Sequence, residues 1–171
     1  MPKSVNRAAT TLGHGLRRSL YPLAALPLGV YSIFLALAGR RARATELQTG
    51  LLPRLLLPPV PEPVEGRALR YGLLSLPVNL AAFALAGYVW LIPVVNLGYP
   101  LRPDVTTESL AHGTWGGPTL AGAWSVHAVG AVLIFVLIGL PILNAVAWLQ
   151  ARLARAVLGG APSTTAASSR T

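Results

Sequence analysis

The sequence predicts an all-α fold: a polytopic helical membrane protein with three hydrophobic helices. Hydrophobic residues make up 53% of the 171 residues and charged residues only 11%, which is too few to cover a water-soluble globule. Three uncharged apolar stretches occupy residues 20–38, 71–95 and 126–149. The net charge of +9 comes from basic clusters beside these stretches. It therefore favours orientation in a membrane over nucleic-acid binding.

The first stretch, residues 20–38, follows a basic segment at residues 1–19 and is just long enough to span a bilayer. It could be a spanning helix, or a re-entrant or interfacial helix, because it contains Pro22 and Pro27. It could also be a signal peptide cleaved after Ala38. Arginines directly after that site disfavour export of the following chain. We expect the segment to stay attached and to be helical, with a kink near Pro27.

The first two apolar stretches are similar to each other at an offset of 50 residues. Six identical pairs carry the similarity, in which residues of 21–36 match residues of 71–86: Tyr21 and Tyr71, Leu23 and Leu73, Leu26 and Leu76, Pro27 and Pro77, Leu35 and Leu85, Ala36 and Ala86. This pattern indicates a duplicated membrane unit.

The second and third stretches are long enough to span with some tilt, and we expect helices at about 71–95 and 118–157. Between the first two stretches lies a proline-rich linker at residues 53–64. Prolines favour an extended backbone, so the connection 39–70 is interpreted as a semi-rigid spacer, or as a docking segment for a proline-recognising partner. The tail, residues 161–171, has the composition of a disordered segment.

The basic residues predict the orientation. The N-terminal segment holds four Lys or Arg residues, connection 39–70 holds six, connection 96–125 holds only Arg102, and the tail holds three. By the positive-inside rule the outer loop 96–125 is extracytoplasmic, whereas loop 39–70 and the C-terminus are cytoplasmic. The N-terminus conflicts with this rule, because a spanning first stretch would place its four basic residues outside.

The outer connection contains a candidate metal site. Asp104, Glu108 and His112 recur every four residues, and a helix opened by Pro103 and closed by Gly113 would place all three on one face. Such a face could hold a metal. The alternative is that the acids near the helix start and the histidine near its end complement the helix dipole. No cofactor is expected.

Four further residues are candidates for ligand or interhelical contacts. Trp115 precedes two glycines and a proline at the predicted start of the third helix, and His127 lies about two turns inside it. Asn79 and Asn144 fall toward the cytoplasmic ends of their helices. Polar side chains at membrane depth mark functional sites or hydrogen bonds between helices.

Three runs, at residues 70–77, 115–130 and 149–159, resemble a known family: the actinobacterial sensor transmembrane domain, found with or without a histidine kinase. The most specific run is WGGPTLAGAWSVHAVG, and the resemblance covers most of residues 18–159. It implies about four helices in two hairpins, each opening with a motif like Tyr-x-Leu-x-x-Leu-Pro. Here the first hairpin is contracted to a single stretch. The resemblance implies no ligand and no catalytic residue.

The expected function is that of a sensor-like or regulatory integral membrane module, with residues 20–160 as a single membrane domain. The sequence has no phosphate-binding loop, nucleophile elbow or HExxH motif, so we expect no enzyme activity. The expected partners are the lipid bilayer, a separate kinase or regulatory protein, and a second copy of the chain, but no nucleic acid. The alternative is a small transport or membrane-assembly subunit with substrate near Asn79, His127 and Asn144.

Overall fold

The computed structural model describes residues 3–160, and these residues form helices without a regular strand. The helices are α1 (Lys3–Ser19), α2 (Tyr21–Leu37), α3 (Arg41–Arg54), α4 (Ala68–Leu97), α5 (Thr107–Ala111), α6 (Leu120–Ile134) and α7 (Leu140–Leu158). Three segments, Arg7–Leu37, Glu65–Leu97 and Leu120–Leu158, are long and apolar enough to cross a membrane. The predicted all-α membrane fold is confirmed. The tail at residues 161–171 lies outside the described part of the chain.

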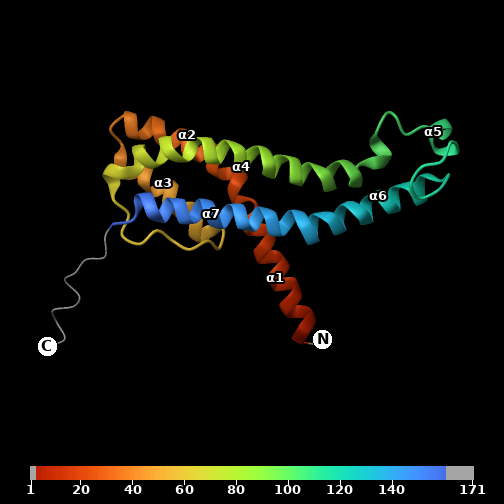
Figure 1. Ribbon diagram of the computed structural model, residues 1–171, viewed down its shortest axis with the longest axis horizontal. Helices are drawn as coiled ribbons and strands as arrows, with labels where there is room; N and C mark the ends of the chain where they lie inside the picture. The colour runs from red at the N-terminus through yellow and green to blue at the C-terminus, as the bar shows by residue number, and fades with distance from the viewer. Residues whose placement is uncertain (1–2, 161–171) are drawn as a thin grey trace.

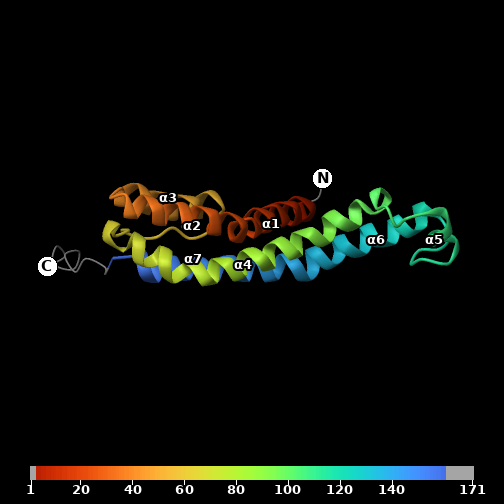
Figure 2. The ribbon, with the colours of Figure 1, turned by 90° about the horizontal axis from the view of Figure 1, so that it is seen from above.

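A long antiparallel hairpin organises the molecule. Helix α4 forms one arm, and α6 and α7 together form the other, as Figure 1 shows in green and blue. Helices α2 and α3 lie against the end of this hairpin at which α4 begins and α7 ends. Helix α1 contacts α7 and projects sideways from the hairpin, which is clear when Figures 1 and 2 are compared.

A π-helical turn, Phe135–Gly139, joins α6 to α7. Pro141 has no backbone N–H and cannot continue the regular hydrogen-bond ladder, so the wider turn lets the N–H of Leu140 bond to the carbonyl of Phe135. In an apolar surrounding such internal repair is required, because lipid offers no hydrogen-bond partner. Gly139 sits in this turn against Val89 of α4, where a Cβ would approach the valine methyl to 2.7 Å. The turn is therefore a close-contact point between the two arms.

The chain breaks between α1 and α2 at Leu20. Pro22 occupies the first turn of α2, where a missing N–H costs nothing, and it prevents α1 from continuing across the junction. Helix α2 runs on through Pro27. The basic N-terminal segment is consequently a separate helix that can take its own direction.

The connection 39–70, which was interpreted as a spacer, contains a packed helix. Residues 41–54 form α3, which packs back on α2 and α4 and buries Ala44, Gln48 and Leu52. The prolines of this connection begin only at Pro53, in the last turn of α3, so nothing prevents a helix before them. The irregular part is restricted to residues 55–64.

Seven basic residues belong to the segments that meet at the end of the hairpin where α2 is followed by α3, α4 begins and α7 ends (Figure 1). They are Arg40, Arg41, Arg43, Arg67, Arg70, Arg152 and Arg155. Backbone hydrogen bonds from Val64 to Leu158 (2.9 Å) and from Gly160 to Glu62 (3.1 Å) tie the two hairpin arms together here. The Arg67 guanidinium also donates to the Gly159 carbonyl. We refer to these seven arginines as the basic end.

A cluster of buried polar side chains connects four helices next to the basic end. Gln48 of α3 donates through Nε2 to the Ser32 hydroxyl of α2 (2.5 Å) and to the carbonyl of Ala68, the first residue of α4 (3.3 Å). Gln150 of α7 donates through Nε2 to Oδ1 of Asn79 on α4 (2.8 Å). Gln150 and Asn79 are only 1% and 3% exposed. These bonds fix the mutual positions of α2, α3, α4 and α7.

Three further residues extend this cluster. Asn79 Nδ2 donates to the Ser75 hydroxyl (3.3 Å) on its own helix. The buried side chains of Tyr21 and Tyr71, which are equivalent at the offset of 50 residues, are hydrogen-bonded to each other. The two similar segments thus meet inside the bundle.

We predict that Asn79 and Gln150 are energetically coupled. Single replacements by alanine, Asn79→Ala and Gln150→Ala, should each lower the free energy of unfolding, because each leaves a buried amide without its partner. The coupling energy of the double-mutant cycle should be about 0.6 to 1.7 kcal/mol, the range found for hydrogen bonds between membrane helices. Reversible unfolding in bicelles measures it.

The matched control for this cycle is Asn96→Ala combined with Gln150→Ala. Asn96 bonds to Ile92 of its own helix (2.8 Å), so its coupling to Gln150 should be close to zero. An Asn79–Gln150 coupling no larger than that of the control would contradict the account of the cluster.

Candidate functional site

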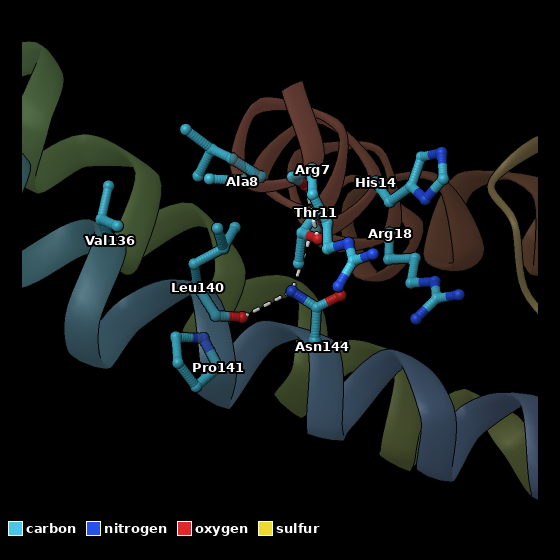
Figure 3. Close-up of a pocket in the computed structure, with 11 residues that line it drawn as sticks. Arg7, Ala8, Thr11, His14, Arg18, Val136, Leu140, Pro141 and Asn144 are labelled. Carbon is cyan, nitrogen blue, oxygen red and sulfur yellow. Dashed lines mark hydrogen bonds between the residues drawn. The ribbon is translucent and has the colours of Figure 1, made fainter. Parts of the chain in front are cut away.

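A large pocket lies between α1 and the hairpin arm formed by α6 and α7. It has a volume of about 860 Å³, within the range of roughly 300 to 1,000 Å³ that is typical of ligand sites. Helix α1 supplies one wall, and the π turn and the first turns of α7 supply the other (Figure 3). We refer to it as the α1–α7 pocket.

The α1 wall is basic. Arg7, His14 and Arg18 line the pocket, and residues 7, 11, 14, 15 and 18 lie along one face of the helix. In Figure 3 the guanidinium groups of Arg7 and Arg18 both extend toward the space beside Asn144. No carboxylate is among the lining residues. Within the described part of the chain, the one salt bridge joins Arg102 to Asp104, far away in the outer loop.

The opposite wall is apolar. Val136, Leu140 and Pro141 form it, and Leu12 of α1 adds an exposed apolar side chain on the basic side. The pocket therefore places unpaired positive charge directly beside hydrocarbon. This combination is the one that an anion with an apolar portion needs.

Close contacts anchor α1 at its C-terminal half. Asn144 Nδ2 donates to the Gly15 carbonyl (3.2 Å) as well as to the Leu140 carbonyl of its own helix (2.7 Å). A Cβ on Gly15 would lie 3.2 Å from the Leu140 side chain, so the two helices pack here at short range. Arg18 Nε donates to the Leu56 carbonyl (3.0 Å). These contacts hold the end of α1 and leave the pocket open toward Arg7.

A second pocket of about 640 Å³ continues from the first, since His14, Arg18 and Asn144 line both. Its remaining walls are formed by Trp148, by Pro53 in the last turn of α3 and by the irregular residues 56–58. The basic face of α1 therefore lies along a continuous groove rather than a single hollow.

The sequence candidates Asn79, His127 and Asn144 do not meet in one cavity. Asn144 lines the α1–α7 pocket. Asn79 lines a cavity of about 10 Å³ together with Tyr21, Gln48 and Tyr71, which is room for about one water molecule. His127 lies at the outer end of the hairpin, where its ring stacks on that of Tyr99 at 4.3 Å.

The outer-loop candidates Asp104, Glu108 and His112 do not share one helix. Helix α5 begins only at Thr107, because Thr106 and Ser109 form a reciprocal capping box there. Asp104 precedes the helix and binds the Arg102 guanidinium (2.6 Å), which lowers the pKa of its carboxyl group. In residues 3–160, no three carboxylate or histidine side chains are close enough together to hold a metal ion.

The outer end of the hairpin is closed by residues 115–130, the run WGGPTLAGAWSVHAVG. Trp124 Nε1 donates to the Leu97 carbonyl (3.0 Å), and His127 Nδ1 donates to the carbonyl of Ala123 (2.8 Å). Thr119 caps α6 by accepting from the N–H of Gly122 (3.2 Å). The candidate Trp115 is 83% exposed. Thr119, Trp124 and His127 thus have structural roles, whereas Trp115 makes its side chain available to solvent.

Sequence reasoning missed the basic wall of the pocket. Arg7 and Arg18 were counted only toward a charged flank, and His14 was not considered, although the spacing of seven and four residues places the three on one face of a helix. That periodicity was the available signal. The opposing wall could not be foreseen, because nothing local indicates that α1 turns back against residues 136–144.

We predict that the outer turn depends on Gly116. It has φ +107°, and its backbone lies so close to that of Gly122 that a Cβ would overlap the Gly122 carbonyl. Gly116→Ala should therefore lower stability by more than Gly117→Ala, in which φ +92° costs about 1–3 kcal/mol but no atom lies within 4 Å of the new Cβ. Thermal unfolding in detergent compares them. Equal losses of stability in the two variants would show that the close approach of Gly116 to Gly122 contributes nothing to stability.

Comparison of the chain with protein-family models, with curated proteins and with solved structures gave no match.

Proposed function

We propose that this chain is a sensor-like, regulatory integral membrane module without a catalytic domain of its own, and that it acts through a partner protein. The observation that carries the proposal is the α1–α7 pocket, in which one wall belongs to α1, a helix that Gly15 and Arg18 anchor through its C-terminal half. A ligand in this pocket contacts α1 and the hairpin at once. Its presence therefore biases the position of α1.

A path of contacts leads from α1 to the basic end. A single residue, Leu20, separates α1 from α2, so a displacement of the end of α1 acts directly on the start of α2. Helix α2 is bonded to α3 through Ser32 and Gln48, and Gln48 also bonds to the first residue of α4. A shift of α1 is transmitted along these contacts to the arginines, where a partner with an acidic surface can dock.

The resemblance to the actinobacterial sensor domain supports the same class of function. The alternative of a transport or assembly subunit finds less support, because Asn79, His127 and Asn144 lie in three separate places. A cavity of about 10 Å³ beside Asn79 is too small for a solute larger than water.

The proposed orientation places the outer loop outside the cell and the basic end in the cytoplasm. We predict that cysteine at Thr107, an exposed residue of α5, reacts with a membrane-impermeant maleimide in intact cells. Cysteine at Glu46, exposed on α3, should react only after lysis. The chain contains no cysteine, so neither experiment has a background. The reverse labelling pattern would overturn the orientation.

The regulatory role is tested by locking α1 in place. The ideal Cβ position at Gly15 lies 3.6 Å from Leu140 Cγ, close enough for the double variant Gly15→Cys/Leu140→Cys to form a disulfide. A photoreactive residue at Arg43 then reports partner contact in native membranes. We predict that the amount of one captured partner changes severalfold between the oxidised and the reduced double variant.

Each single-cysteine variant serves as the control and should show no redox effect. If partner capture is the same with α1 locked or free, or if the captured proteins are transporter subunits, the regulatory proposal is wrong and the alternative gains support.

A further inference from the structure

We propose that the α1–α7 pocket binds an anionic phospholipid, with the phosphate on Arg7 and Arg18 and an acyl chain along Val136, Leu140 and Pro141. This inference rests on the proposed function, because it names the ligand of the same pocket. It concerns a lipid of the surrounding bilayer, not a solute that arrives from water.

The charge of the pocket selects an anion. Three basic side chains line it and no acid does. The five acidic residues of the chain lie elsewhere, at Glu46, Glu62, Glu65, Asp104 and Glu108. Arg18 uses Nε on the Leu56 carbonyl, which leaves its terminal nitrogens for another acceptor. The Arg7 guanidinium has no hydrogen-bond partner among residues 7–160, whose side chains the structure describes. Two guanidinium groups directed at one space match the oxygens of a phosphate.

The apolar wall selects an amphiphile over a small anion. Leu140 and Pro141 face the arginines across the pocket, and Val136 continues the wall toward the outer half of the hairpin. The neighbouring apolar side chains Leu133 and Leu137 are 52% and 69% exposed. An acyl chain that leaves the pocket in this direction remains in contact with hydrocarbon. Free phosphate would leave that wall uncovered.

The location of α1 gives an independent reason for a lipid. The C-terminal half of α1 packs on α7 at Gly15, beside the middle of a hairpin that exposes apolar side chains over most of its length. Charges next to hydrocarbon are stable when a counter-charge accompanies them. Basic pockets between membrane helices bind acidic headgroups for this reason.

The test uses the purified full-length protein, delipidated in neutral detergent and titrated with short-chain phosphatidylglycerol or phosphatidylcholine while native mass spectrometry counts bound lipid. We expect phosphatidylglycerol to bind at least tenfold more tightly than phosphatidylcholine. The variant Arg7→Gln/Arg18→Gln should lose about tenfold in affinity for phosphatidylglycerol. The control Arg40→Gln/Arg43→Gln removes the same charge from the basic end and should bind within twofold of wild type.

The wall is tested separately by Val136→Thr, which keeps the side-chain shape and adds a hydroxyl group. It should weaken phosphatidylglycerol binding severalfold. Inorganic phosphate at millimolar concentration should not displace the lipid. Displacement of the lipid by phosphate would identify a small-anion site. Equal losses of phosphatidylglycerol affinity in Arg7→Gln/Arg18→Gln and in Arg40→Gln/Arg43→Gln would show charge attraction without a pocket. Either result, or equal binding of the two lipids, overturns the proposal.

These outcomes can be separated from those of the proposed function. If lipid binding follows the prediction while the α1 lock leaves partner capture unchanged, the lipid site is structural and the regulatory role is wrong. If the lock changes partner capture while the lipids bind equally, the regulatory role stands and the ligand is not a phospholipid.

Discussion

The hydrogen bond between Gln150 and Asn79 is the interaction on which the rest of the arrangement depends. It joins the two arms of the hairpin through side chains that are almost completely buried. A buried amide without a partner is costly in apolar surroundings, so this bond restricts the register of α7 on α4 to the one in which the two side chains meet. Gln48 acts in the same way for α2 and α3.

The same constraint explains the irregular parts of the helices. Pro22 and Pro141 each remove a backbone donor. At Pro22 one helix ends and another begins. At Pro141 a π turn lets the carbonyl of Phe135 accept a hydrogen bond from the N–H of Leu140. These two adjustments determine where the pocket lies. The first frees α1 to leave the direction of α2, and the second brings the apolar residues Val136 and Leu140 to its opposite wall.

The long arms could be predicted from the sequence, because apolar length alone requires helices at 71–95 and 126–149. Helix α3 was not predicted. The five prolines of its connection favoured an extended backbone, although none of them precedes Pro53. Asn79 and Asn144 were recognised as polar residues in apolar helices, but their partners, Gln150 and Gly15, are 71 and 129 residues away. The pocket could not be predicted for the same reason. The residues of each wall can be recognised in the sequence, but the contact between the two walls cannot.

The central claim is that an anionic lipid fixes the position of α1 on the hairpin. It is tested most directly by the distance between spin labels at Ala9→Cys on α1 and Ala84→Cys on α4, both exposed positions, in nanodiscs of phosphatidylglycerol or phosphatidylcholine. A pair at Gly50→Cys on α3 and Ala84→Cys serves as the reference, since α3 packs on α4. The account predicts a narrow Ala9–Ala84 distribution in phosphatidylglycerol, a shifted or broader one in phosphatidylcholine, and an unchanged reference pair. Identical Ala9–Ala84 distributions in the two lipids would contradict it.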